Sequence, residues 1–460
     1  MTCRNNIKRD SFIMSTIDEL VPQDHLVRKL ERGMDLSFIY EKVRHLYSPF
    51  GRSSIDPVVL FKLLLINIIF GLNSMRKTCE ECKVNLAYRW YLGLDINEKI
   101  PDYSTWSQNY IRRYKDSEIF NELFEAVLSR AIKKRYVDPE TIFGDGTHQK
   151  ANANKRKSHK KIVEIAKKAY EEELLKEINE DRECIGKSTY ESMEKTETIY
   201  DEETGEEKKV TKTKEINVSN TDPESGCFHK GEKEKCFAYT HQTFCDKNGF
   251  VLGVKTFPGN IHDSVAFFET YEEVNKRFEG LIKNVSLDAG YLSPAICKTI
   301  IENGQEAFMP YKAPMTKKGY FKKYEYVYDK LYDFYICPNG ETLSYTTTKR
   351  DGHREYKSDQ EKCKDCPLRE QCTKSKNHTK VINRHLWEEY REAVEETRHT
   401  DKWKEIYPKR KETIERVFAD WKEKFGMRFT RVRGLKKNQH QALISFACHN
   451  LKRMAIWSCK

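Results

Sequence analysis

The amino-acid sequence predicts an α+β protein with several domains. Apolar residues recur at helical spacing in the first part of the chain, which predicts a helical amino-terminal domain over residues 1–137. Strand-like runs then alternate with helical segments over residues 138–312, which predicts a mixed α/β core. Residues 313–400 hold four spaced cysteines and predict a Cys-rich insertion, after which residues 401–460 return to the core as helices. A chain of 460 residues is long enough for this division.

Composition favours nucleic acid as a partner. The chain has 82 Lys and Arg against 71 Asp and Glu, a net charge of +11, and 12% of its residues are aromatic. The first residues lack a continuous apolar segment, so we expect no secretory signal. The most apolar run, residues 58–72, contains Lys62 and Asn67 and is too short to span a bilayer. We therefore expect a cytoplasmic protein with no membrane partner, whose cysteines are free thiols or metal ligands.

The amino-terminal domain should be built from capped helices. Asp56 and Pro57 supply an N-cap and a first-turn proline before the apolar run. A further helix after Asp102 would expose Arg112 and Arg113, as a helix-turn-helix-like unit does when it presents a basic helix to DNA. A solvated basic helix explains the same residues equally well.

Two strand-like runs of the core each end in an aspartate. Residues 141–146 form a β-prone run that ends near Asp145, and residues 284–291 form another that leads to Asp288. Between them, the apolar runs on both sides of residues 246–249 read as a β-hairpin, because AspLysAsnGly is a turn sequence.

Residues 155–220 form a charged insertion that is dense in Lys and Glu and poor in apolar residues. Its first half, to Glu183, could be a solvated helix or a hairpin. Its second half, around residues 202–209, reads as loop or disorder.

A helix over residues 407–425 supplies a third carboxylate. Its apolar residues recur at the spacing of one buried stripe: Ile414, Val417, Phe418, Trp421 and Phe425. Glu415 borders this stripe, and Lys422 shares its side of the helix. Alone, Glu415 is most simply a surface residue. Together with Asp145 and Asp288 it gives three hard oxygen ligands at the ends of central elements, which suits two divalent cations.

Several motifs resemble one family when taken together. They are AspGlyThrHis and AlaAsnAlaAsnLys within 145–155, ThrAspPro and HisLysGly within 221–231, ProGlyAsnIleHisAsp at 258–263, AspAlaGlyTyr at 288–291, and ArgLysGluThrIleGluArgValPhe at 410–418. Residues 85–94 and 102–107 of the amino-terminal domain match the same family. Over nearly its whole length, the chain therefore resembles bacterial insertion-sequence transposases of the DDE type. Within them it is similar to the eleven-eighty-two group of the insertion-sequence-four superfamily.

This resemblance implies an RNase H-like catalytic domain in which Asp145, Asp288 and Glu415 bind two Mg²⁺ or Mn²⁺ ions. Such enzymes cut double-stranded DNA at the inverted-repeat ends of the element and join the freed 3′-hydroxyl to target DNA. Each step is an in-line displacement at phosphorus, which needs positioning and charge neutralisation. The cutting of paired ends implies a homodimer, by analogy alone.

The superfamily's Tyr–Arg–Glu–Lys signature falls on four residues: Tyr407, Arg410, Glu415 and Lys422. Arg410 precedes Glu415 by five residues instead of four, which turns it away from the Glu415 face of a regular helix. Lys411 lies on that face, so either residue could contact a phosphate. Further cations that could grip the DNA backbone follow the helix: Arg428, Arg431, Arg433, Lys436 and Lys437.

Four cysteines of the insertion predict a structural metal site. They are Cys337, Cys363, Cys366 and Cys372. Four cysteines with a CxxC pair suit one zinc ion, which would hold together an insertion with few apolar residues. Their unequal spacing also leaves an iron–sulfur cluster or four unligated thiols open. Cys79 and Cys82 form another CxxC, but they lie in a helical pattern with no second pair nearby, so we interpret them as structural.

Two classes of function agree with these features. The first is an active DNA transposase, and the second is a catalytically inactive, transposase-derived DNA-binding protein. The complete set of three carboxylates favours the first. A zinc-dependent transcription regulator would leave those carboxylates unexplained.

Overall fold

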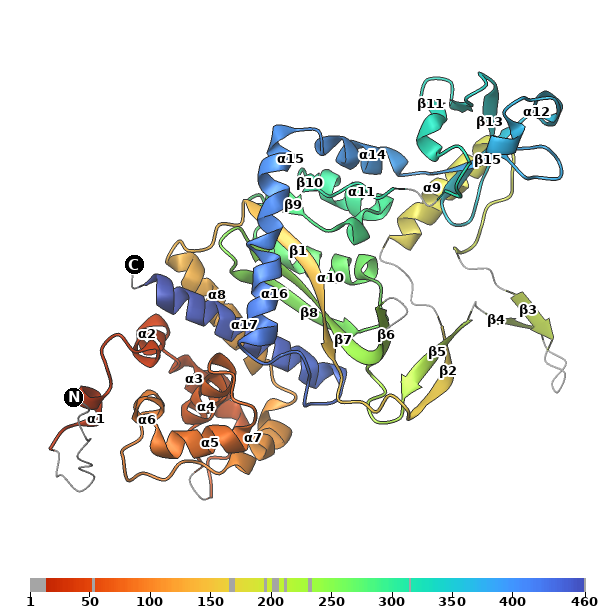
Figure 1. Cartoon of the computed structure of the whole chain (residues 1–460). Helices are drawn as coiled ribbons and strands as arrows, with labels where there is room; N and C mark the ends of the chain where they lie inside the picture. The colour runs from red at the N-terminus through yellow and green to blue at the C-terminus, as the bar shows by residue number, and fades with distance from the viewer. Residues whose placement is uncertain are drawn as a thin grey trace, which may run out of the picture.

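A computed structural model describes residues 14–51, 54–164, 170–193, 197–200, 207–210, 213–230, 234–313 and 316–458. It is a mixed α/β molecule with several sheets, as the sequence predicted (Figure 1). No helix in these ranges is both long and apolar enough to cross a membrane.

The amino-terminal part is helical. Its helices are α1 (Ile17–Leu20), α2 (Leu26–Gly33), α3 (Phe38–Val43), η1 (Arg44–Leu46), α4 (Pro57–Ile69), α5 (Met75–Val84), α6 (Leu86–Leu92), α7 (Tyr103–Asn109), η2 (Tyr110–Tyr114) and α8 (Ile119–Lys133). Asp56 caps α4, as predicted, by accepting the N–H of Val58 at 2.7 Å. Cys79 and Cys82 are buried free thiols of α5, in keeping with a structural role.

A six-stranded sheet forms the core, with β1 near its centre. Its strands are β1 (Thr141–Lys150), β6 (Gly226–Lys230), β7 (Glu234–Asp246), β8 (Val251–Pro258), β9 (Asn284–Ser286) and β10 (Glu306–Phe308). β1 pairs antiparallel with β7 and parallel with β9, so Phe143 stands between Cys245 and Ser286. β7 turns into β8, which confirms the predicted hairpin, and β10 extends the sheet beyond β9.

Helices cover both faces of this sheet. Neighbouring residues of a strand point to opposite faces. On β7, the ring of His241 contacts Trp421 of α16 (Ile414–Glu423). Phe244, three residues later, contacts Phe267 of α10 (Asp263–Arg277). α16 and α10 therefore lie on opposite faces, and α11 (Pro294–Glu302) contacts α10 and β10.

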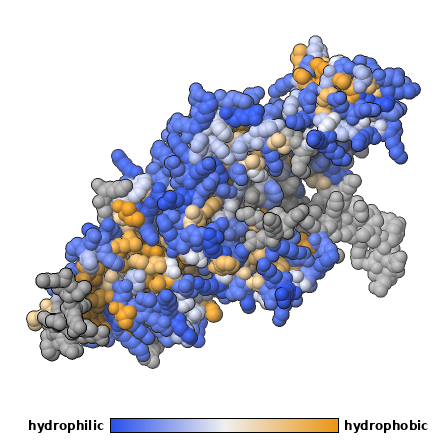
Figure 2. Space-filling model, viewed as in Figure 1, coloured by the Kyte–Doolittle hydropathy of each residue, from blue (hydrophilic) through white to orange (hydrophobic). Residues whose placement is uncertain are grey.

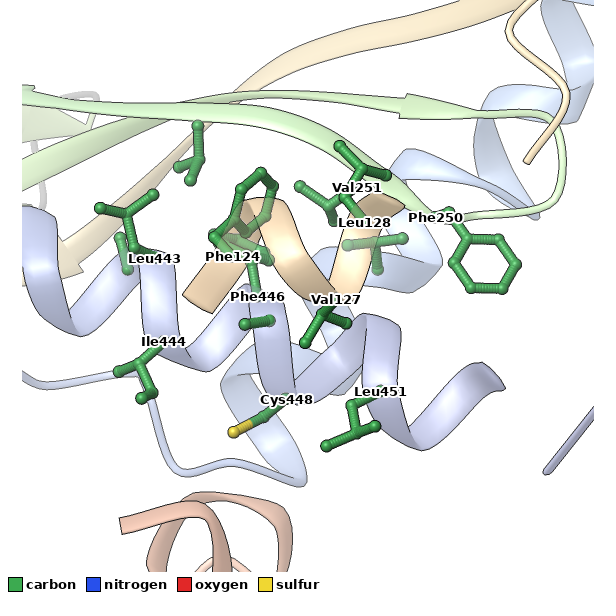
Figure 3. Close-up of a cluster of buried hydrophobic side chains, with 14 of the residues drawn as sticks. Phe124, Val127, Leu128, Phe250, Val251, Leu443, Ile444, Phe446, Cys448 and Leu451 are labelled. Atoms are coloured by element: carbon green, nitrogen blue, oxygen red, sulfur yellow. The ribbon is translucent and has the colours of Figure 1, made fainter. Parts of the chain in front are cut away.

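The carboxy-terminal helix α17 (Leu435–Trp457) joins the amino-terminal helices to the sheet. Figure 3 shows Leu443 and Phe446 of α17 beside Phe124 of α8 and Val251 of β8. The same helix packs on α2 and α4. Because full burial of each such side chain contributes about 1.5–3 kcal/mol, this contact ties the two regions into one hydrophobic core. The predicted packing of the last helix on the core is thus confirmed.

A second sheet lies in the segment predicted to be Cys-rich. It consists of β11 (Val327–Asp329), β12 (Phe334–Ile336), β13 (Thr342–Thr348), β14 (His353–Ser358) and β15 (Val381–His385), paired in that order. Short helices flank it: η4 (Lys323–Glu325), α12 (Gln360–Lys364) and α13 (Arg369–Cys372). α14 (Glu388–Thr397) and α15 (Asp401–Ile406) then lead back to the core. Figure 2 shows a mostly hydrophilic surface on which apolar side chains gather over the amino-terminal helices and over this small sheet.

The charged insertion contains more packed structure than predicted. Its first half forms β2 (Ser158–Glu164) and α9 (Glu171–Cys184). α9 is not a solvated helix, because it buries Leu174 and Ile178 in a cluster with Trp387. Its Asp181 also accepts two bonds from Arg354 of β14, at 2.5 and 2.6 Å.

The second half of the insertion, predicted as loop or disorder, contains three strands among its described residues. They are β3 (Glu197–Tyr200), β4 (Glu207–Val210) and β5 (Thr213–Ser219). β5 pairs with β2 in a two-stranded ribbon that leaves the core beyond the end of β1 (Figure 1). Part of the predicted loop, residues 201–206, lies outside the described residues.

Candidate active site

Two neighbouring parallel strands bring Asp145 and Asp288 to the same region. Phe143 of β1 is paired with Ser286 of β9, and each aspartate stands two residues beyond its member of that pair. The parallel register therefore places the two backbones side by side at this level of the sheet. Asp288 ends the strand segment and begins η3 (Ala289–Tyr291), where its carboxylate accepts the N–H of Ala289 at 2.7 Å.

Glu415 reaches the same region from above the sheet. It is an exposed residue in the first turn of α16, the helix that covers the face with His241. Tyr407, in the preceding 3₁₀ helix η5 (Tyr407–Lys411), lies within electrostatic range of all three carboxylates. Burial raises the pKa of the Tyr407 hydroxyl, and the negative charges of Asp288, Glu415 and Asp145 raise it further, against the lowering effect of Arg410. All four side chains therefore act on one phenol.

Arg410 links the middle of β1 to the end of β9. Its side chain is 5% exposed. One guanidinium nitrogen donates to the carbonyl oxygens of Gly144 at 2.9 Å and Ser286 at 3.1 Å, and the other pairs with Asp145 Oδ2 at 3.0 Å. A guanidinium suits this position because its planar fork can bond several acceptors at once. The charge of Asp145 is thereby balanced inside the protein.

The helix around Arg410 differs from the one predicted. The sequence predicted a continuous helix over residues 407–425, but η5 and α16 are separated at Thr413, whose φ of −107° and ψ of −98° are not helical. The Thr413 hydroxyl donates back to the Lys409 carbonyl at 2.7 Å. This break lets Arg410 turn inward to β1 and β9 while Lys411 remains exposed. The spacing argument for a regular helix is therefore wrong at this point.

Close packing beneath Asp145 also excludes a side chain at Gly144. A Cβ atom there would stand 2.4 Å from the ring of Phe244 and 2.7 Å from Leu287. Glycine is needed at this position because the strand approaches its neighbours too closely for any other residue.

A layer of buried polar residues under the site was not predicted. His241 hydrogen-bonds Thr256 at 2.9 Å and Gln149 at 3.1 Å, and burial, with smaller effects of His148 and Lys422, lowers its pKa to about 3. Lys422 of α16 is half-buried over this layer. The only signal in the sequence is a HisGln pair inside an apolar strand, whose burial depends on α16 packing from far along the chain.

The loop after Asp288 is anchored to the opposite face of β7, the one that α10 covers. Tyr291 is 1% exposed and donates to Gln242 Oε1 at 2.8 Å. This bond fixes the AspAlaGlyTyr segment against β7 and so limits the movement of Asp288. The motif was visible in the sequence, but the partner of its tyrosine was not.

The donor set of this site suits a hard cation in its chemistry. Asp145, Asp288 and Glu415 offer carboxylate oxygens alone, which Mg²⁺ prefers. In the described part of the chain, no group of three or more His, Cys, Asp or Glu side chains is gathered closely enough to hold a metal ion. The grouping around Tyr407 is therefore looser than a preformed metal cage, and Asp145 already has Arg410 as its counter-ion.

Two segments match family models of transposases. Residues 336–455 match the transposase DDE domain, and residues 15–112 match a transposase domain known as DUF772. Both matches support a DDE-type insertion-sequence transposase. The first segment contains Tyr407, Arg410 and Glu415, whereas β1 and β9 lie outside both, so the assignment of Asp145 and Asp288 rests on the geometry above. No curated protein and no solved structure matches the chain.

The cations predicted to bind DNA lie in two regions. Arg431 and Arg433 are exposed in the loop between α16 and α17. Arg112 and Arg113 lie in η2, which is a π-helical turn and not the regular helix that was predicted. Arg112 is exposed as predicted, but Arg113 is half-buried, donates to Asn109 and lies over the ring of Tyr47. Figure 1 places this turn, next to α7, beyond the carboxy-terminal end of α16, whereas Glu415 lies in the first turn of α16.

The predicted zinc site is not supported. The thiol of Cys372 contacts the Tyr326 hydroxyl at 3.2 Å, Cys363 donates to Ser358 at 3.2 Å, and Cys337 accepts an N–H from Glu341 at 3.3 Å. These four cysteines are among the described residues, which contain no metal-holding cluster. The segment is instead held by a core of tyrosines and aliphatic residues, which are Tyr326, Tyr335, Leu343, Tyr356 and Ile382. The segment therefore has an apolar core of its own, which its small number of apolar residues did not predict.

Proposed function

We propose that the chain is an active transposase that cuts the ends of an insertion sequence and joins the freed 3′-hydroxyl to target DNA. The observation that carries this proposal is that three carboxylates from separate elements, Asp145, Asp288 and Glu415, all lie within electrostatic range of Tyr407. The match of residues 336–455 to a transposase DDE domain supports the same chemistry, and a transposase acts on DNA.

We further propose an RNase H-like catalytic core. In support, β1 stands near the centre of a mixed sheet, antiparallel to β7 and parallel to β9, and its neighbour β9 leads directly to Asp288. Helices cover both faces of this sheet. We place the substrate DNA at the surface beside Tyr407 and Glu415.

Asp145, Asp288 and Glu415 would hold two Mg²⁺ or Mn²⁺ ions. Bound there, the ions would supply charge neutralisation and an activated water for in-line attack at phosphorus. Asp288 and Glu415 are exposed to incoming ligands, while Arg410 orients Asp145 from beneath. Arg410 therefore acts as a positioning residue, and the exposed Lys411 is the better candidate for a phosphate contact.

Other cations would bind duplex DNA around this centre. We assign Lys422, Arg431 and Arg433 to the DNA near the cut, and Arg112 and Arg113 to a separate contact of the amino-terminal helices. Simultaneous work on two transposon ends would require two active sites, so we propose a homodimer as the active form.

The experiment compares the active protein with the inactive alternative. Full-length protein would be incubated with linear DNA that carries the flanking inverted repeats and with a target plasmid, with Mg²⁺, with Mn²⁺ or with no divalent metal. We expect cuts at the repeat ends and joined products only when a divalent metal is present. Specific binding without any cut in either metal would support the catalytically inactive DNA-binding protein instead.

A further inference from the structure

We propose that the turn at residues 155–157 and the ribbon of β2 and β5 form, together with Arg431 and Arg433, one phosphate-binding surface for duplex DNA. We call it the ribbon surface. The proposal deepens the function above and rests on it, because it names the part of the charged insertion that would hold the DNA on which the carboxylates act.

The charge of this segment is unusually one-sided. Residues 155–161, LysArgLysSerHisLysLys, contain five Lys or Arg and no carboxylate. All seven are exposed. One of them, Lys160, pairs with Glu215 of the facing strand at 2.9 Å, but both partners are open to solvent and such a pair is weak. A DNA phosphate could therefore displace Glu215 from Lys160 with little loss of free energy.

One asparagine, Asn152, joins this segment to the loop that carries Arg431 and Arg433. Asn152 donates from its side chain to the Arg431 carbonyl at 3.0 Å, and its own carbonyl accepts from Arg433 Nε at 3.0 Å. The bond from Arg433 is made to a neutral oxygen, and the carboxylate that acts on its charge, Asp222, is itself buried and bonded to Tyr239 and Gly434. Lys150 strengthens the junction, because its backbone exchanges two bonds with Arg428 and Thr430, at 3.1 and 2.9 Å.

Asn154 shapes the basic turn itself. Its side-chain oxygen accepts the N–H of Arg156 at 2.9 Å, and its backbone N–H donates to Thr221 Oγ1 at 3.0 Å. Lys157 closes the turn by donating to the Asn154 carbonyl at 3.2 Å and accepting the N–H of Asn220 at 2.9 Å. The AlaAsnAlaAsnLys motif thus brings cations from two distant parts of the chain together and fixes their backbones.

The distance to the catalytic centre suits one DNA segment. Lys155 follows Asp145 by ten residues, of which the first five lie in β1, so the two residues are at most about 33 Å apart. This is about one turn of B-form DNA, whose major groove also admits a two-stranded β-ribbon. The ribbon surface would therefore contact duplex DNA within about one helical turn of the scissile phosphate.

The test measures binding, without cutting, and with the full chain. The anisotropy of a fluorescein-labelled duplex of arbitrary sequence would be followed without divalent metal at several salt concentrations. The variant Lys155→Gln/Arg156→Gln/Lys157→Gln should reduce the slope of log affinity against log salt by about 2–3, since each phosphate contact contributes about 0.9. Asn154→Ala should weaken binding in the same direction without any change of charge.

A matched control removes three exposed cations at the other end of β1. Arg130→Gln/Lys133→Gln/Lys276→Gln alters the end of α8, which leads into β1, and the end of α10, which leads into β9. The slope for this control should stay close to that of the wild type. Equal slopes for the ribbon variant and the control would overturn the ribbon surface while leaving the proposed function intact.

Two other outcomes separate the remaining explanations. If the wild type binds no duplex DNA, the proposed function fails and the ribbon surface fails with it. If an unlabelled single strand of the same length displaces the probe more effectively than unlabelled duplex does, and the ribbon variant removes this advantage, the surface serves single-stranded DNA and the assignment to duplex is wrong.

Discussion

At the scale of single residues, the site depends on one buried arginine that sequence spacing had turned away from the Glu415 face of a regular helix. Arg410 reaches two strand carbonyls and Asp145 because the backbone breaks at Thr413. That break follows from tertiary bonds of Arg410 and from the Thr413 hydroxyl, neither of which leaves a pattern in the sequence. The β-prone runs before both aspartates were predictable, but β1 does not end at Asp145 as predicted: its pairing with β7 carries it on to Lys150.

We predict that Arg410→Lys lowers the free energy of unfolding by about 3 kcal/mol, because a single ammonium group cannot satisfy three buried acceptors on two strands. Urea unfolding would measure this. Arg416→Lys, an exposed position on α16, is the matched control and should change stability by less than about 0.5 kcal/mol. A fully stable Arg410→Lys protein would contradict the positioning role.

Lys411→Gln should affect DNA binding and not stability, in contrast to Arg410→Lys. Lys411 is exposed, so its loss should leave stability unchanged but weaken binding to duplex DNA several-fold, and more so at low salt. Unchanged DNA affinity at low salt would remove Lys411 from the DNA-binding surface.

At the scale of elements, α17 shows how distant residues define a helix. The sequence predicted helices within residues 401–460, and the last of them begins at Leu435. Its first N–H groups are bonded by another segment: Asp222 accepts the N–H of Gly434 at 3.0 Å, and Glu224 accepts that of Leu435 at 3.0 Å. Such long-range caps are invisible in local sequence.

Two buried histidines make the docking of α17 sensitive to acid. Burial lowers the pKa of His440 and of His449 to about 4 each, so both are neutral in the folded protein at neutral pH. His440 stacks on Phe120 of α8 at 4.4 Å, and His449 bonds the Gly249 carbonyl at 3.0 Å. Because the unfolded chain binds protons first, their contribution to stability is present above pH 6.5 and is lost as the pH falls towards 4.

We therefore predict that the free energy of unfolding falls between pH 6.5 and 4, and that His440→Phe makes this fall shallower by up to about 3 kcal/mol. Urea unfolding at pH 7.5, 6 and 5 would measure it. His45→Gln, at an exposed position, should leave the pH dependence unchanged. If the pH dependence is identical in wild type and His440→Phe, the claim that burial lowers the pKa of His440 is wrong.

At the scale of the whole molecule, the sequence predicted the elements that depend on neighbouring residues and missed those that depend on packing against distant ones. The capped amino-terminal helices, the hairpin and the strands before both aspartates follow from short stretches of sequence. The five-stranded sheet and the packing of α9 do not, because their apolar residues are few and are buried only against partners elsewhere in the chain. The predicted zinc site of the four cysteines is not supported among the described residues.

The most direct test of the central claim is the rate of cutting at inverted-repeat ends by single-site variants. We predict that Asp145→Asn, Asp288→Asn and Glu415→Gln each reduce the rate by about 10²-fold or more in Mg²⁺ and in Mn²⁺, while binding to duplex DNA is preserved. Asp401→Asn, an exposed carboxylate of α15, should cut like the wild type. Cutting at the wild-type rate by any one of the three variants would show that these carboxylates are not one catalytic centre.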